Sequence, residues 1–193
     1  MTALEQLLRA TVSQLVANGS PFALVGGLAV SVRTEPRFTR DADLAVAVAT
    51  DDDAEALVHR LQGAGFVLHA VIEQHAAGRL ATVRLSKPAD VEGPVVDLLF
   101  ASSGIEPEII EAAESLELLP GLHLPVATIG HLIALKVLAR DDVERPQDIV
   151  DLRALARRAS DFERRRAREA VALIHARGYH RDRDLEAALR GFL

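Results

Sequence analysis

Three aspartates stand at the start of, or inside, apolar runs of this chain. Asp41 and Asp43 open a run that continues to Val48, and Asp97 interrupts the run Pro94–Phe100. In a strand, residues two apart point to the same face, so Asp41 and Asp43 are expected side by side. Neighbouring carboxylates repel each other, and an ionised aspartate among buried residues is costly without a partner. We therefore expect a cation between these side chains, and an oxygen-ligated divalent metal ion is the usual one.

A glycine pair precedes these acids. The apolar run Phe22–Val25 meets Gly26 and Gly27, where the backbone can turn sharply and approach a ligand closely. A helix over Gly27–Arg33 would direct free N–H groups and the positive end of its dipole at that ligand, as phosphate sites do. For the glycines taken alone, a tight strand-to-helix turn without a ligand is the simpler interpretation.

Three arginines lie between the glycine pair and the acids. Arg33 ends the expected helix, and Arg37 and Arg40 belong to the loop that follows it. Taken alone, all three are most simply interpreted as ion-pair partners of the two nearby aspartates.

Lysine is rare in this chain, which uses arginine for 20 of its 22 basic residues. Lys87 lies in an expected turn and needs no special role. Lys136 lies inside the apolar helix expected over Ile129–Arg140, where it is either a snorkelling side chain or a group whose compact ammonium is required. Asp148 and Asp151 follow, three residues apart on one helix face; they are either acids of a helix N-terminus or partners in a site.

The order of these features resembles the polymerase-β-type nucleotidyltransferase fold, with its glycine turn, Asp-x-Asp and later strand aspartate. With the run Arg37–Leu44, Lys136, Arg145 and the Asp148/Asp151 pair, the chain is similar over about Phe22–Leu155 to the AbiEii/MenT-type nucleotidyltransferase toxins of bacterial toxin–antitoxin systems. The resemblance implies an α/β (α+β) fold, with a mixed sheet flanked by helices. It also implies a nucleotidyltransferase core over residues 1–127 and a helical C-terminal subdomain over 128–193 that completes the active site.

The resemblance further implies roles for single residues. Asp41, Asp43 and Asp97 would hold two Mg²⁺ ions, with Mn²⁺ as a substitute, and Asp97 would also accept the proton of the acceptor hydroxyl. Asp151 would orient Lys136 or hold the acceptor. The residues expected around the triphosphate of the NTP are Gly26, Gly27, Arg37, Thr39, Arg40, Lys136 and Arg145.

Toxins of this family add nucleotides to tRNA 3′ ends and are neutralised by a cognate antitoxin. The resemblance thus implies transfer of a nucleoside monophosphate from an NTP to tRNA. Two alternatives stay open. The same acids would serve an acceptor hydroxyl on a protein or on a small molecule such as an aminoglycoside. The second alternative is a non-catalytic binding module that has kept the fold, but a complete set of three acids argues against it.

Composition narrows the remaining possibilities. A chain of 193 residues suits one domain with a sizeable core. Cysteine is absent, which excludes disulfides, thiolate zinc sites and cysteine nucleophiles. The N-terminus lacks the apolar centre of a signal peptide, and no stretch has the length of a membrane span, so we expect a cytoplasmic protein.

Charge is distributed unevenly along the chain. Residues 1–150 carry 11 Lys/Arg against 21 Asp/Glu, whereas residues 151–193 carry 11 Arg against 7 acids. The basic end is either a surface for the tRNA backbone, with Arg164, Arg165 and Arg168 as contacts, or a solvated helix with internal ion pairs. The acids Asp51–Asp53, which follow Thr50, are expected to complement a helix dipole rather than hold a metal ion.

Overall fold

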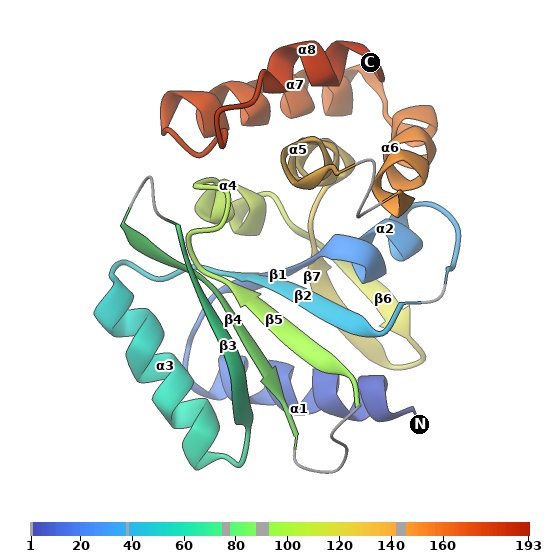
Figure 1. The fold of residues 1–193 in the computed structure, drawn as a ribbon. Coiled ribbons are helices and arrows are strands. Elements are labelled where there is room, and N and C mark those ends of the chain that lie inside the picture. Colours follow the sequence, from blue (N-terminus) through green and yellow to red (C-terminus); the bar gives the residue numbers. More distant parts are fainter. Residues whose placement is uncertain (1, 38, 75–77, 88–92, 142–145) are drawn as a thin grey trace.

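The computed structural model describes residues 2–37, 39–74, 78–87, 93–141 and 146–193 (Figure 1). Its centre is a mixed seven-stranded sheet in the order β3-β4-β5-β2-β1-β7-β6. The strands are β1 Phe22–Val25, β2 Asp41–Val46, β3 Val67–Gln74, β4 Arg79–Ser86, β5 Val95–Leu99, β6 Glu114–Leu119 and β7 Leu122–Val126. The expected mixed sheet with flanking helices is therefore confirmed.

Eight helices among the described residues flank this sheet. They are α1 Ala3–Ala17, α2 Gly26–Arg33, α3 Asp51–Gly63, α4 Glu106–Glu111, α5 Ile129–Ala139, α6 Gln147–Arg158, α7 Asp161–Ala176 and α8 Leu185–Arg190. In Figure 1, α1 and α3 lie on one side of the sheet, and α2, α4 and the C-terminal helices α5–α8 lie on the other. None of the helices in the described ranges is both long and apolar enough to cross a membrane.

Side-chain caps fix where several helices begin. Thr2, Thr128 and Ser160 each accept a hydrogen bond from the backbone N–H three residues ahead, at the starts of α1, α5 and α7. Thr50 and Asp53 form a reciprocal capping box at α3. At the other end of α3, Lys87 Nζ donates to the carbonyl of Ala64 at 2.8 Å.

The acids at the start of α3 are structural, as the sequence indicated. Asp53 belongs to the capping box, and Asp51 accepts from Arg79 Nε at 2.7 Å and from the backbone N–H of Leu80 at 3.0 Å. These bonds attach the start of α3 to β4.

The alternation of β2 determines which side of the sheet carries the acids. Ala42, Leu44 and Val46 are buried, whereas Asp41 and Asp43 alternate with them and are partly exposed. Because side chains alternate between the faces of a strand, burial of the apolar set fixes the acids on the opposite face.

One edge of the sheet is a hairpin. It consists of the strands β6 and β7, which pair in antiparallel orientation. β7 pairs in parallel with β1, so this hairpin extends the central sheet.

α5 is the central helix of the C-terminal group, and it is buried on nearly every side. α7 approaches it closely at Gly130, where an added Cβ would lie 2.6 Å from the carbonyl oxygen of Glu163. The Glu163 carboxylate also accepts a hydrogen bond from the Gly130 N–H. These contacts seat α5 between the sheet side of the molecule and α7 (Figure 1).

Candidate active site

Three aspartates project from one face at the middle of the sheet. β2 and β5 run in parallel, and their register places Asp43 directly beside Asp97 and Asp41 beside Val95. Residues paired across adjacent strands share a face, as do residues two apart in one strand. Asp41, Asp43 and Asp97 therefore face the same side of the sheet.

The glycine turn lies directly against this set of acids. Gly26 has a φ of +63°, and a Cβ at this position would lie 1.8 Å from Oδ2 of Asp43. A Cβ on Gly27 would lie 2.8 Å from Nη2 of Arg37 and 3.2 Å from Oγ1 of Thr39. Only glycine combines this backbone conformation with such close neighbours, so the pair brings the start of α2 against both the acids and Arg37.

Arg84 is a site residue that the sequence analysis missed. Its Nε and Nη2 donate to the two carboxylate oxygens of Asp97 at 2.8 and 2.7 Å. Hydrogen bonding to Asp97, together with the charges of Asp97, Asp41 and Asp43, holds the pKa of Arg84 above its usual range, although burial acts against this. The available signal was a lone charged residue in an apolar strand, the same kind of signal that identified Asp97.

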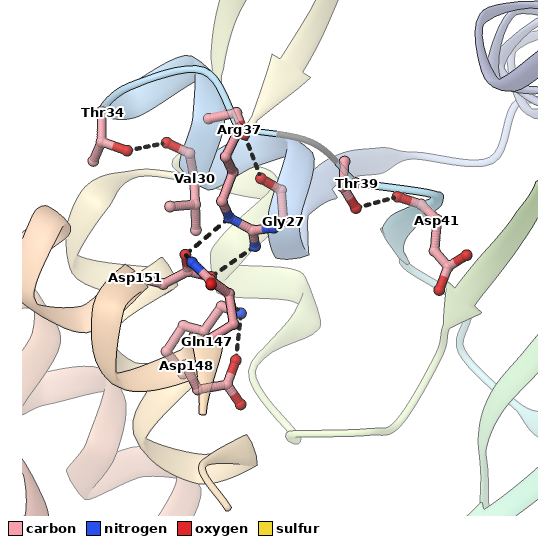
Figure 2. Close-up of polar contacts among 11 residues, drawn as sticks. Gly27, Val30, Thr34, Arg37, Thr39, Asp41, Gln147, Asp148 and Asp151 are labelled. Atoms are coloured by element: carbon pink, nitrogen blue, oxygen red, sulfur yellow. Dashed lines mark hydrogen bonds and ion pairs between the residues drawn. The ribbon is translucent and has the colours of Figure 1, made fainter. Parts of the chain in front are cut away.

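A second cluster of charges lies between the α2–β2 loop and the C-terminal helices. Figure 2 shows Arg37 reaching from that loop to Asp151 on α6. Arg37 Nε and Nη2 donate to the two oxygens of Asp151 at 2.9 and 2.8 Å. Lys136 Nζ lies 2.6 Å from Oδ1 of Asp148 and 2.8 Å from Oδ2 of Asp151, and Gln147 Nε2 donates to Asp151 at 3.3 Å.

Asp151 is the centre of this cluster and is only 2% exposed. Burial acts to raise its pKa, but the hydrogen bonds from Lys136 and Arg37 and the charge of Lys136 outweigh burial and hold the pKa below the usual value. Asp151 is thus ionised at neutral pH. Lys136, whose side chain is 12% exposed, is held by two carboxylates, which excludes the snorkelling interpretation.

Arg37 and Arg33 have partners that their sequence position did not indicate. Arg37 binds Asp151, and Arg33 binds Glu114 and the carbonyls of Val126 and Ala127. Both partners come from segments distant in sequence, so local spacing was misleading for these two residues.

The other predicted nucleotide-binding residues are placed as follows. Thr39 lies beside Gly27, and its hydroxyl donates to the carbonyl oxygen of Asp41 at 3.3 Å (Figure 2). Arg40 is exposed. Arg145 falls outside the described residues.

The donor chemistry of the acid face fits a divalent cation, because three carboxylates share one side of the sheet. Within the described ranges, however, no group of three or more His, Cys, Asp or Glu side chains is gathered tightly enough to hold a metal ion. Asp97 instead directs both oxygens at Arg84, whose guanidinium provides the positive charge that a metal ion would provide.

Fold and acid face together define a nucleotidyltransferase-like protein, and solved structures share the fold. An antigenic nucleotidyltransferase-like protein from Paracoccidioides brasiliensis aligns with a TM-score of 0.53 and 20% identity, over 97% of this chain and 92% of that one. The lincosamide antibiotic adenylyltransferase LnuA, bound to lincomycin, aligns with a TM-score of 0.51 and 14% identity, over 82% of this chain and 100% of that one. The MenT4 nucleotidyltransferase toxin from Mycobacterium tuberculosis aligns with a TM-score of 0.45 and 17% identity, over 96% of this chain and 92% of that one.

The chain belongs to the AbiEii family. The family described as nucleotidyl transferase AbiEii toxin, type IV toxin–antitoxin system, matches residues 6–193, which is almost the whole chain. No curated protein matches the sequence significantly. The resemblance inferred from the glycine pair and the aspartates is therefore confirmed at the level of the family.

Proposed function

We propose that this protein is a metal-dependent toxin that transfers a nucleoside monophosphate from an NTP to the 3′ end of tRNA and is neutralised by a cognate antitoxin. The observation that carries this proposal is the register of β2 and β5, which sets Asp43 beside Asp97 on the face that carries Asp41, with Gly26 against Asp43. Transfer needs two things at one place, carboxylates for cations and backbone N–H groups for phosphates, and this arrangement provides both.

The acids would perform the chemistry at the reacting phosphate. Asp41, Asp43 and Asp97 would hold two Mg²⁺ ions, or Mn²⁺, which when bound screen the phosphate charge and align the acceptor with the leaving pyrophosphate. Asp97 would accept the proton of the acceptor hydroxyl. Gly26 and Gly27 begin α2, so their N–H groups and the helix dipole would bind the triphosphate.

The second charge cluster would complete the nucleotide site. Arg37 lies beside Gly27, within reach of a triphosphate bound at the start of α2, and Thr39 lies on the same side. Asp151 would position both Arg37 and Lys136, because it binds the two cations at once. Since Lys136 comes from α5 and Asp151 from α6, we propose that a C-terminal subdomain over residues 128–193 completes a core formed by residues 1–127.

Exposed arginines of the C-terminal helices support tRNA as the acceptor. Arg153, Arg157 and Arg168 are exposed and would contact phosphates without sequence preference. Arg164, which the sequence analysis included in this surface, instead donates to the carbonyls of Ala156 and Ala159 at the end of α6. Its role is structural, so a test of RNA binding must leave Arg164 intact.

The acceptor is tested by incubating the protein with Mg²⁺ and each α-labelled NTP, together with total tRNA, total protein or aminoglycosides and lincosamides. We expect label in tRNA, and none with the Asp43→Asn variant. Label in protein or antibiotic, with none in RNA, would replace tRNA by the alternative acceptor. The antibiotic arm is included because LnuA, which shares the fold, is a lincosamide adenylyltransferase.

The tRNA surface is tested separately by charge reversal of Arg153, Arg157 and Arg168. If these side chains neutralise phosphates, tRNA affinity falls steeply with salt in the wild type and less steeply in the triple variant. Reversal of the exposed acids Glu169 on α7 and Glu186 on α8 is the control and should not weaken binding. Salt-independent binding that the triple variant preserves would remove nucleic acid from the proposal.

A further inference from the structure

We infer that Arg84 is the counter-ion of Asp97 in the absence of metal, and that Arg84 must release this carboxylate when a divalent cation binds. The inference rests on the proposed metal-dependent function and goes beyond it, because it assigns to a residue of β4 the control of metal affinity. Arg84 would be a positioning residue, since it acts on the reaction only through Asp97.

Arg84, Asp97 and Asp43 form one row across three adjacent strands. Arg84 is paired with Asp97 in the antiparallel β4–β5 register, and Asp97 is paired with Asp43 in the parallel β5–β2 register. Side chains paired in this way share a face and are close neighbours. The guanidinium therefore lies on the acid face, at the end of the row.

The contact of Arg84 with Asp97 uses both ends of the carboxylate. The two hydrogen bonds of 2.8 and 2.7 Å are the parallel, two-pronged geometry in which a guanidinium holds a carboxylate best. A divalent cation on the same oxygens would lie a few ångströms from a permanent positive charge, and repulsion at that distance is strong away from bulk water. The two cations therefore compete for Asp97.

Arg84 is also the partner that is free to leave. Its side chain is 45% exposed, whereas that of Asp97 is 13% exposed and belongs to a central strand. The charged groups of the sheet that act on Arg84 are Asp97 on the adjacent β5 and Asp41 and Asp43 on β2, one strand further away. Once it no longer binds Asp97, the guanidinium can move into solvent, while the carboxylate stays on the acid face.

Competition of this kind lowers the apparent affinity for metal. If only a fraction of the molecules have a free Asp97, the apparent dissociation constant rises by the inverse of that fraction. Removing the competitor should then tighten metal binding by roughly three- to tenfold, as expected when about 70–90% of Asp97 is paired. In the purely structural alternative, Arg84 holds Asp97 in place for metal, and removing Arg84 should weaken metal binding.

The test uses the full-length protein and Mn²⁺ alone, without nucleotide, with free Mn²⁺ counted by electron paramagnetic resonance. The variants are Arg84→Gln, which removes the charge, Arg84→Lys, which keeps the charge but not the fork, and Asp97→Asn. Arg79→Gln is the matched control, because Arg79 is a β4 arginine that pairs with Asp51 at the start of α3. Thermal unfolding of each variant verifies that it is folded.

We expect Arg84→Gln to bind Mn²⁺ about three- to tenfold more tightly than the wild type, Arg84→Lys to lie between the two, and Arg79→Gln to equal the wild type. Unchanged or weaker binding by Arg84→Gln, with Asp97→Asn impaired, would overturn the role of Arg84 and leave the proposed function intact. Wild-type binding by Asp97→Asn would instead remove Asp97 from the metal site, and with it both the inference and the proposed mechanism.

Discussion

The carboxylate of Asp43 lies so close to Gly26 that a Cβ on residue 26 would stand 1.8 Å from Oδ2 and 2.5 Å from Cγ of Asp43. Because Gly26 begins α2 and Asp43 lies in β2, this contact joins the glycine turn to the acid face. Both halves of the proposed site thus depend on the absence of a side chain at residue 26.

Gly26→Ala should therefore impair both activity and stability. The methyl group clashes with Asp43, and the positive φ is strained for alanine, so we expect a loss of about 2–4 kcal/mol in the free energy of unfolding measured with urea. Combining it with Asp43→Ala removes the contacts with Oδ2 and Cγ but leaves the Asp43 Cβ at 2.8 Å, so only part of that stability should return, while transfer stays absent. Equal stability of Gly26→Ala and wild type would show that the turn is looser than described.

Removal of Asp151 should destabilise the fold through its partners. Asp151→Asn leaves Arg37 and Lys136 without the buried charge that they share, and breaking such a buried pair typically costs about 3–5 kcal/mol. Glu169→Gln, an exposed carboxylate on α7, is the control and should change stability by less than about 0.5 kcal/mol. Similar urea midpoints for the two variants would mean that the cluster contributes no stability.

Lys136→Arg should be harmful although it preserves charge. The ammonium fits between Asp148 and Asp151 at 2.6 and 2.8 Å in a largely buried position, and the wider guanidinium cannot replace it there without displacing α5 or α6. We expect at least about tenfold slower transfer, a cost comparable to disturbing a residue that orients an active-site ligand. An arginine variant with wild-type transfer and stability would show that any cation suffices.

Two buried groups, His131 and Asp151, should each lower the free energy of unfolding as pH falls, in different pH ranges. Burial, aided by the charge of Arg166 and opposed by that of Glu108, lowers the pKa of His131 to about 4. The folded state therefore excludes a proton that the unfolded state binds below its ordinary pKa of about 6.5, so stability is complete above that pH and declines between pH 6.5 and 4. The expected loss is on the order of 3 kcal/mol.

The second acid step comes from Asp151, whose pKa is lowered in the folded protein. Its stabilising contribution is present above the ordinary aspartate pKa of about 3.9 and is lost as pH falls through the lower folded value. Urea unfolding between pH 8 and pH 3 separates the two steps, because His131→Gln should flatten only the one between pH 6.5 and 4. A slope in that range that survives the substitution would assign it to another group.

The sequence was sufficient for the parts of the site governed by local rules. Strand alternation placed Asp41 and Asp43 on one face, and the glycine pair predicted the close turn that the structure has at Gly26. The acids that follow Thr50 likewise indicated the start of α3. Each of these features depends on residues within a few positions of one another.

Features that depend on tertiary packing could not be predicted from local sequence in the same way. Arg37 and Asp151 are 114 residues apart, and nothing in their local spacing favours this pair over a pair with Asp41. Arg84 was missed because its importance depends on the β4–β5 register, which determines whether it lies opposite Asp97. Arg164 was a candidate for a nucleic-acid surface from charge alone, but it binds backbone carbonyls at the end of α6.

The central claim, that the acid face performs nucleotidyl transfer, is tested most directly by Asp43→Asn. Transfer from an α-labelled NTP in Mg²⁺ is measured beside urea unfolding, with Asp53→Asn, which alters only the cap of α3, as the control. We predict a loss of transfer greater than about 100-fold in Asp43→Asn with stability equal to or above that of the wild type, because one of two neighbouring carboxylates is neutralised. Near-wild-type transfer by a folded Asp43→Asn enzyme would contradict the account.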